Sequence, residues 1–379
     1  MSLRPLDGFV VGITADRRWE EQAELLARRG AAVLHGPTIT TQYLASDEDL
    51  RRATRAVIAA RPDYLVATTG IGMRAWMEAA AVWGLGEDLV GVLSAARVVA
   101  RGPKAAAAVQ AGGVEVWARS STEQMGALVD LMLEEPLAGR TVAVQEYGMP
   151  NPEPSSALRG AGAAVIEVPV YRWRVPEDPA PVLRLAEAAC GGRVDAITFT
   201  SAPAVHNLFA IAAEHGLADE LRAACNGGVV AACVGPVCAE GARQEGIEEP
   251  LAPSVGRLGL LVRALSEHLG QRRRVLGLAG ADVVVQGSAL SVDGERVELT
   301  RRERGLLEAL VAARGAVVSR GALLAQVWGS PDVDAHVLEV TVCRLRRRLG
   351  PCGAALQATP GRGYRLEQDE MGQPAATGT

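Results

Sequence analysis

Short apolar runs alternate with longer amphipathic segments along the first 268 residues. Val10-Val-Gly-Ile13 precedes an amphipathic segment from Glu20 to Arg29, and Ala32-Val-Leu34 follows it. Alternating strands and helices with short connections are typical of parallel sheets covered by helices. We therefore expect an α/β fold. In such sheets ligands bind at the carboxyl ends of strands, here after Ile13, Val66, Phe199 and Val234.

The same pattern recurs at an offset of about 132 residues. The segment from Asp63 to Thr69 aligns with Asp195 to Ser201, and Gly30-Ala-Ala-Val33 aligns with Gly162-Ala-Ala-Val165. The sequence therefore predicts a duplicated α/β unit in residues 1–268.

The alternation stops at the basic stretch Gln271-Arg-Arg-Arg274. We interpret residues 269–281 as a linker, because a polar run bounded by glycines interrupts the periodic pattern. Residues 282–367 then form a separate domain. The last segment, residues 368–379, is polar and rich in Gly, Pro and Ala, which predicts a disordered tail.

Helical periodicity and a capping box organise the C-terminal domain. Thr300 and Glu303 have the spacing of a capping box, which predicts the start of a helix. Leu306, Leu307 and Leu310 continue it as one apolar stripe. The predicted helices span residues 300–313, 319–329 and 333–349; the predicted strands span 283–285, 289–292 and 296–299, with a hairpin at 356–359 and 364–366.

The third predicted helix has one apolar and one basic side. We place Thr341, Arg344 and Arg348 on the exposed side, flanked by Arg346 and Arg347. Arginine can pair bidentately with guanine in the major groove, and an α-helix fits that groove. The pattern therefore favours a helix that reads double-stranded DNA.

Charge supports this interpretation. Residues 299–366 contain eleven arginines and five acidic residues, whereas the rest of the chain has 28 basic and 39 acidic residues. A local positive field suits a polyanionic partner for this domain. The only lysine, Lys104, lies outside any Gly-Lys-Ser/Thr loop, which excludes a P-loop. Without a long apolar run or a leader-like N-terminus, we expect a cytoplasmic protein and no membrane contact.

The C-terminal domain resembles the winged helix-turn-helix of OmpR/PhoB-type response regulators. The matching strings are Leu299-Thr300 with Glu303, Val317-Val-Ser-Arg320, Val327-Trp-Gly329, Arg344-Leu-Arg-Arg347 and Gly361-Arg-Gly-Tyr-Arg365.

This resemblance assigns roles to individual residues. It implies that Val340, Thr341 and Arg344 meet base edges, and that Arg362 enters a minor groove. It implies backbone contacts for Arg320, Trp328, Arg346 and Arg347, and Arg348 completes the DNA-binding set. Pro360 stands where several relatives place the wing arginine, which shifts that contact to Arg362.

The N-terminal region lacks the residues of a receiver domain. Thr14-Ala-Asp16-Arg17 replaces the expected acid pair, and Lys104 does not follow the fifth strand. The region instead resembles uroporphyrinogen-III synthase (HemD). The matching segments are Leu158 to Tyr171, Asp195 to Ser201 with Pro203-Ala-Val205, Val234-Gly-Pro236 and Gly246-Ile247.

That resemblance implies two α/β lobes joined by two strands. Lobe one would comprise residues 1–36 and 172–268, and lobe two residues 40–168. The cleft of the family binds a linear tetrapyrrole with eight carboxylates, without metal or cofactor. The corresponding ligand-binding residues here are Thr14, Arg17, Thr68, Thr69, Arg74, Arg101, Arg172, Thr200 and Ser201.

Catalytic residues carry over only in part. Tyr171 matches the family tyrosine that is proposed to assist loss of the hydroxyl group, and Ser201 matches a cleft hydroxyl. Two family threonines are replaced by Ala105 and Cys238. The competing interpretation is that Tyr171 is a packed core residue and that the arginines near the cleft are solvated surface residues.

Three hypotheses follow. The first is a transcription regulator whose HemD-like region senses a tetrapyrrole, another polycarboxylate or a protein partner. Such fusions resemble actinobacterial regulators of nitrate and nitrite assimilation, a process linked to siroheme. The second is an active synthase that cyclises hydroxymethylbilane and carries a DNA-binding domain. The third is a protein whose lobes serve only as a platform for dimerisation or for docking a partner. We expect a homo-oligomer on DNA and leave open another transcription regulator as partner.

Overall fold

A computed structural model describes residues 3–43, 48–120, 122, 124–146, 148 and 152–369. The chain forms two compact units, residues 1–39 with 176–379, and residues 40–175. The first unit contains a parallel sheet with its helices, which we call lobe one, and the C-terminal domain, residues 274–369. The second unit contains lobe two. No helix of the described residues combines the length and apolar character needed to span a membrane.

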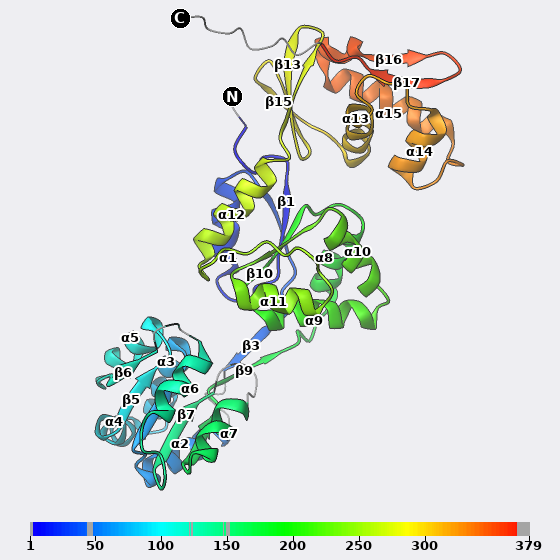
Figure 1. The fold of residues 1–379 in the computed structure, drawn as a ribbon. Coiled ribbons are helices and arrows are strands. Elements are labelled where there is room, and N and C mark those ends of the chain that lie inside the picture. Colours follow the sequence, from blue (N-terminus) through cyan, green and yellow to red (C-terminus); the bar gives the residue numbers. More distant parts are fainter. Residues whose placement is uncertain are drawn as a thin grey trace, which may run out of the picture. The chain divides into compact units, whose positions relative to one another are not determined.

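Lobe one is built on a four-stranded parallel sheet (Figure 1). In spatial order its strands are β11 (Val230–Cys233), β10 (Ala196–Phe199), β1 (Val10–Ile13) and β2 (Ala32–His35). Its helices are α1 (Trp19–Arg28), α8 (Ala180–Cys190), α9 (Ala202–Glu214), α10 (Ala218–Gly227), α11 (Pro236–Gln244) and α12 (Leu258–Gly270).

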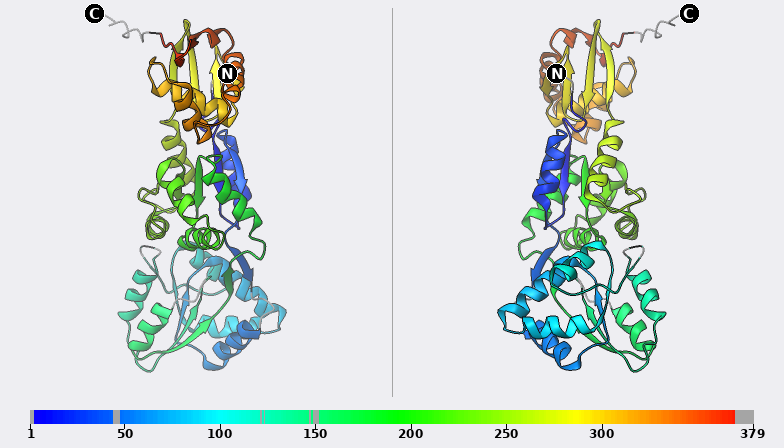
Figure 2. Two further views of the ribbon diagram at one scale, coloured as in Figure 1. Left: turned by 90° about the vertical axis from the view of Figure 1, so that its right-hand side faces the viewer. Right: turned by 90° about the vertical axis from the view of Figure 1, so that its left-hand side faces the viewer.

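Helices cover both faces of this sheet (Figure 2). Val11 and Ile13 pack with Leu26 of α1 and Leu261 of α12 on one face. Gly12 faces the opposite side, where a Cβ atom would lie 2.5 Å from the side chain of Leu185 in α8. Buried parallel strands of this kind carry continuous apolar runs, which explains the pattern in the sequence.

Lobe two has a five-stranded parallel sheet. Its strands are β6 (Ala118–Arg119), β5 (Arg97–Ala100), β4 (Tyr64–Ala67), β7 (Thr141–Gln145) and β8 (Ala164–Val168). Its helices are α2 (Glu48–Ala60), α3 (Gly70–Val82), α4 (Gly86–Ala95), α5 (Pro103–Ala111), α6 (Met125–Leu133) and α7 (Pro152–Gly160). An antiparallel pair, β3 (Thr40–Tyr43) with β9 (Tyr171–Arg174), belongs to the same unit.

The predicted α/β fold with parallel sheets is confirmed, and the duplication takes a specific form. Strands β1 and β2 of the first repeat join β10 and β11 of the second in lobe one. Lobe two combines β4 and β5 of the first repeat with β7 and β8 of the second. Each sheet therefore draws on both sequence repeats, so a repeat is not itself a lobe.

The C-terminal domain has a four-stranded antiparallel sheet, three helices and a hairpin. The sheet strands are β12 (Arg274–Leu278), β13 (Ala281–Gln286), β14 (Ala289–Val292) and β15 (Glu295–Glu298). The remaining elements are α13 (Arg301–Ala312), α14 (Arg320–Trp328), α15 (Ala335–Arg348), the 3₁₀ helix η1 (Gly350–Ala355), β16 (Leu356–Thr359) and β17 (Gly363–Leu366).

The predicted linker over residues 269–281 is wrong. Strand β12 occupies much of it and pairs antiparallel with β13. Leu276 and Leu278 are buried while Val275 is 51% exposed, which is the alternation of a half-buried strand. The neighbouring arginines obscured that alternation in the sequence.

The predicted tail begins too early. The amide of Asp369 donates to the Gly277 carbonyl at 2.9 Å, and its carboxylate accepts from the Gly280 amide at 2.8 Å. This residue is therefore held against the β12–β13 turn. Residues 370–379 of the predicted tail lie outside the described residues.

Candidate functional site

The helix-turn-helix is formed by α14 and α15, whose ends are fixed by caps. Ser319 accepts a hydrogen bond from the Ala322 amide at the start of α14. Gly329 ends that helix with φ +83°, a conformation that favours glycine. Asp334 caps α15 by accepting from the His336 amide. These caps confirm the predicted helices to within two residues.

The inner side of α15 packs on the domain core through Leu338, Val342 and Leu345. Thr341 lies on this side as well. It is 8% exposed, and its hydroxyl donates to the Val337 carbonyl at 2.7 Å. The prediction that Thr341 lies on the exposed face is therefore wrong. The residue is one turn from both Leu338 and Leu345, so it shares their buried stripe.

The outer side of α15 presents Arg344, Arg347 and Arg348, all exposed, with Val340 half-buried. This part of the predicted basic face is confirmed. Arg346 behaves differently, because its Nε and one terminal nitrogen donate to the Leu356 carbonyl at 2.9 and 2.8 Å. Its guanidinium ties α15 to β16, and so it differs from the arginines that face solvent.

Arg320 and Trp328, the predicted backbone contacts on α14, have partners within the domain. Arg320 forms an ion pair with Glu339 at 3.2 Å and lies over the Tyr364 ring at 5.9 Å. The ring of Trp328 is half-buried, with the guanidinium of Arg302 5.2 Å from its centroid. Sequence reasoning did not single out Arg302 and gave Tyr364 no role beyond its place in the wing motif, because these contacts depend on tertiary packing.

The wing is the β16–β17 hairpin, with Arg362 exposed at its turn. Val318 and Tyr364 exchange backbone hydrogen bonds of 2.8 and 3.0 Å, which tie the wing to the segment before α14. A Cβ atom on Gly363 would lie 2.0 Å from the Val318 carbonyl oxygen. Glycine is therefore required where the wing meets this segment.

The ligand residues predicted in lobe one differ in accessibility. Thr14 is fully buried, and its hydroxyl donates to the Thr198 carbonyl at 2.8 Å, so it links the ends of β1 and β10. Arg17 and Thr200 are exposed, and Ser201 is half-buried at the start of α9. The last three lie just beyond the carboxyl ends of strands.

Three of the predicted lobe two residues, Thr68, Thr69 and Arg101, follow strand ends, whereas Arg74 lies on α3 and Arg172 within β9. Thr68 is buried and donates to the Gln145 carbonyl at 2.9 Å, while Thr69 caps α3. Arg74 is exposed on α3 and Arg101, half-buried, follows β5. The guanidinium of Arg172 lies 3.6 Å from the carboxylate of Asp49.

Glu146 is a titratable residue of lobe two that sequence reasoning missed. It follows β7, and its amide donates to the Val168 carbonyl. Burial, with the nearby charge of Glu167, raises the pKa of Glu146, although Arg172 opposes that shift. Only the packed fold brings these charges close enough to affect it.

The residues considered for catalysis are mostly enclosed. Tyr171 is 4% exposed and packs with the lobe two core beside Trp173. Ala105 and Cys238 occupy equivalent positions in α5 and α11, and are 1% and 3% exposed. The Cys238 thiol faces the Phe199 carbonyl oxygen at 3.6 Å.

Two features define the class of protein: α/β lobes built from a duplicated unit, and a C-terminal winged helix-turn-helix. Residues 20–263 match the family model described as uroporphyrinogen-III synthase HemD. This chain therefore belongs to the uroporphyrinogen-III synthase HemD family. Residues 294–366 match the model described as "Transcriptional regulatory protein, C terminal", and form an OmpR/PhoB-type DNA-binding domain.

Similar proteins reflect the same two parts. A mutant uroporphyrinogen III synthase from Thermus thermophilus is 33% identical, with a TM-score of 0.57, covering 69% of this chain and 99% of its own. The uncharacterized protein YjjA of Bacillus subtilis is 28% identical over 70% of this chain and 97% of its own length. The transcriptional regulatory protein KdpE of Mycobacterium tuberculosis is 35% identical over 126 residues. The match covers 32% of this chain and about half (54%) of KdpE.

Proposed function

We propose that this protein regulates transcription by binding double-stranded DNA through α15 and the wing. The observation that carries the proposal is the exposed basic side of α15, with Arg344, Arg347 and Arg348 opposite a fully packed apolar side. A rigid helix with this distribution can enter the major groove without exposing its core.

The residues divide into two kinds of contact. Arg344 reads base edges, because a guanidinium on the groove-facing side can donate two hydrogen bonds to guanine. Arg320, Arg347 and Arg348 contact phosphates, which supplies affinity that is independent of sequence. Arg362 at the wing turn enters the adjacent minor groove. Trp328 supports the backbone contact from α14.

The lobes act as the sensing module, and their ligand is a polycarboxylate such as a tetrapyrrole acid. Arg17 in lobe one and Arg74 and Arg101 in lobe two follow the carboxyl ends of their sheets. Thr69, Arg172, Thr200 and Ser201 complete the set. Arginine pairs well with carboxylates because its planar fork can donate two parallel hydrogen bonds. We leave Thr14 and Thr68 out of the ligand set, because both hydroxyls donate to backbone carbonyls within their own lobes.

Synthase activity is not part of the proposed function. The two positions that would carry family threonines are Ala105, which has no hydroxyl, and Cys238, whose thiol is buried. Tyr171 is packed in a hydrophobic core, which does not favour a proton donor to a large substrate. A regulator needs to hold a ligand, but it does not need to turn it over.

The resemblance to regulators of nitrate and nitrite assimilation makes those genes the first targets to examine. Siroheme, a product of uroporphyrinogen III, would connect the proposed ligand to that process. Binding as a homo-oligomer, or together with a second regulator, is part of the same proposal.

Selection of bound duplexes from random DNA tests the proposal with the full chain. We expect a defined sequence preference, and an affinity that falls steeply as salt rises because phosphate contacts release counterions. Binding with no sequence preference and no dependence on salt would exclude a transcription regulator of this type.

A further inference from the structure

We infer that the amino-terminal edge of the lobe one sheet is a docking surface for the DNA-binding domain, and that the Asp195–Arg304 ion pair is one of its main contacts. Arg304 on α13 donates to the Asp195 carboxylate at 2.8 Å. The side chains are 23% and 9% exposed, so the pair is largely shielded from water. The inference depends on the proposed function for one point only, namely that the docked domain binds DNA.

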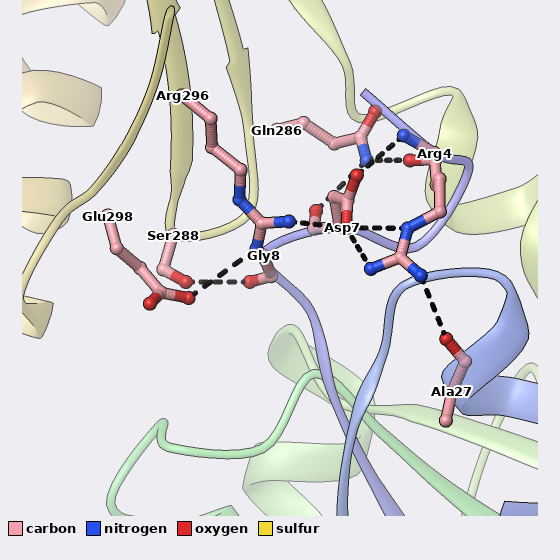
Figure 3. A network of polar contacts seen from close by, with 8 residues as sticks. All are labelled: Arg4, Asp7, Gly8, Ala27, Gln286, Ser288, Arg296 and Glu298. Atoms are coloured by element: carbon pink, nitrogen blue, oxygen red, sulfur yellow. Dashed lines mark hydrogen bonds and ion pairs between the residues drawn. The ribbon is translucent and has the colours of Figure 1, made fainter. Parts of the chain in front are cut away.

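A second set of contacts joins the N-terminal segment of lobe one to the DNA-binding domain (Figure 3). The Gly8 carbonyl accepts from the amide and the hydroxyl of Ser288, at 2.7 and 3.0 Å. The Gln286 amide group donates to the carbonyls of Arg4 and Asp7, at 2.8 and 2.9 Å. Arg296 donates to the buried Asp7 carboxylate at 2.7 Å. We call these contacts, together with the Asp195–Arg304 pair, the dock.

The duplicated fold provides an internal reference for the dock. Asp63 in lobe two stands at the position of Asp195, because both precede equivalent strands, β4 and β10. One oxygen of Asp63 accepts from the Thr141 amide at 2.8 Å, as Asp195 accepts from Val10 at 2.8 Å. The other oxygen of each accepts from an arginine. In lobe two that arginine is Arg140, from the same lobe, at 2.7 Å.

Lobe one lacks an arginine of its own at this place. Strand register pairs Tyr64 with Val142 and Ala196 with Val11, which makes Phe9 the counterpart of Arg140. Phe9 is 1% exposed and belongs to the lobe core. In lobe one, Arg304 of the DNA-binding domain therefore binds Asp195 in the way that Arg140, a residue of lobe two, binds Asp63.

The glycines at the two edges support the same conclusion. Gly8 and Gly139 are equivalent and have φ of +79° and +74°. A Cβ atom on Gly8 would lie 2.3 Å from the backbone at Gln286 and Ala289, whereas one on Gly139 would meet none of the described atoms within 4 Å. The same backbone turn thus packs against the DNA-binding domain in lobe one. In lobe two, none of the described residues covers the equivalent turn at Gly139.

The dock leaves the proposed DNA-binding surface of α15 and the wing exposed. On the side of the DNA-binding domain, the hydrogen bonds and ion pairs of the dock come from the end of β13, the β13–β14 turn, β15 and α13. Arg344, Arg347 and Arg362 remain exposed in the docked arrangement. Asp195 of the dock directly precedes strand β10, and the proposed ligand residues Thr200 and Ser201 directly follow it, so one strand connects the two sites.

Hydrogen exchange of the Ser288 amide in the full chain, without DNA, tests the dock. Because this amide donates to Gly8 across the dock, its exchange reports opening. Removing one partner of a shielded ion pair is costly, so Arg304→Met should accelerate exchange roughly tenfold. Arg304→Lys keeps the charge and should fall between Arg304→Met and the wild type.

Arg140→Met is the matched control, since it breaks the equivalent pair within lobe two and should leave Ser288 exchange unchanged. Wild-type exchange in Arg304→Met, or equal acceleration by Arg140→Met, would overturn the inference. Arg344→Ala separates this inference from the proposed function. It should reduce DNA binding without changing Ser288 exchange, so either proposal can fail alone.

Discussion

Arg346 donates two hydrogen bonds to the carbonyl oxygen of Leu356, at 2.9 and 2.8 Å, and so joins the recognition helix to the wing. Its neighbour Arg347 is exposed on the same helix. Two adjacent arginines in one basic run therefore differ: Arg346 is bound within the domain, whereas Arg347 faces solvent, where we propose that it contacts DNA.

Arg346→Met should destabilise the C-terminal domain by about 1 to 3 kcal/mol, because hydrogen bonds that involve a charged group contribute that much and the Leu356 carbonyl would lose its donor. Calorimetric unfolding of the full chain measures the effect. Arg347→Met is the matched control and should leave the unfolding transition in place. Equal destabilisation by both substitutions would contradict the distinction.

Thr341→Val should leave DNA sequence preference unchanged. Valine preserves the shape of the side chain, and the lost hydroxyl bonds only the Val337 carbonyl in the structure. If Thr341 reads a base, the same change should cost about 1 to 3 kcal/mol at one position of the site. Binding of the variant to single-base variants of the selected duplex decides between these results.

Asp7 gives the dock a dependence on pH. Burial alone would raise the pKa of Asp7, but hydrogen bonds from Arg4 and the charge of Arg296 outweigh it and lower the pKa below the ordinary 3.8. A carboxyl group with a depressed folded-state pKa stabilises above its unfolded pKa, and this stabilisation is lost as pH falls through the folded value.

Only the lowering caused by Arg296 crosses the dock, because Arg4 lies in lobe one; this contribution to docking should be constant above about pH 5 and decline below 3.8. Asp7→Asn should remove this part of the decline and lower stability at neutral pH. Ser288 amide exchange, corrected for its intrinsic pH dependence, provides the measurement. An identical pH profile in wild type and variant would show that Asp7 does not contribute.

Incubation with hydroxymethylbilane should yield only the spontaneous type I product. The reason is that Ala105 and Cys238 supply no hydroxyl to the reacting tetrapyrrole and Tyr171 is enclosed. Separation of the isomers gives a direct answer. Formation of the type III isomer above the rate without protein would establish the synthase instead.

Local signals in the sequence predicted much of the fold. Thr300 and Glu303 form the expected capping box, with the Thr300 amide donating to the Glu303 carboxylate at 2.7 Å. The repeat offset identified equivalent strands, and the family resemblance supplied the lobe arrangement, in which each sheet draws on both repeats. These features depend on residues close in sequence or on periodicity, so a single chain contains the information.

Contacts between residues far apart in the chain could not be predicted from the sequence. Nothing in the basic run distinguishes Arg346 from Arg347, because the Leu356 carbonyl that selects between them is brought near by η1 and β16. Asp195 and Arg304 are separated by 109 positions, and only the docked domains bring them together. Spacing of three and seven residues from Arg344 and Arg348 suggested that Thr341 is exposed, whereas its equally close spacing to Leu338 and Leu345 places it in the buried stripe.

The affinity of Arg344→Ala for the selected duplex and for a scrambled duplex tests the central claim most directly. We predict a loss of about 1 to 3 kcal/mol on the selected duplex and little change on the scrambled one, because we propose that Arg344 reads base edges. Equal affinity of the wild-type chain for both duplexes, or an equal loss on both in the variant, would contradict DNA reading by α15.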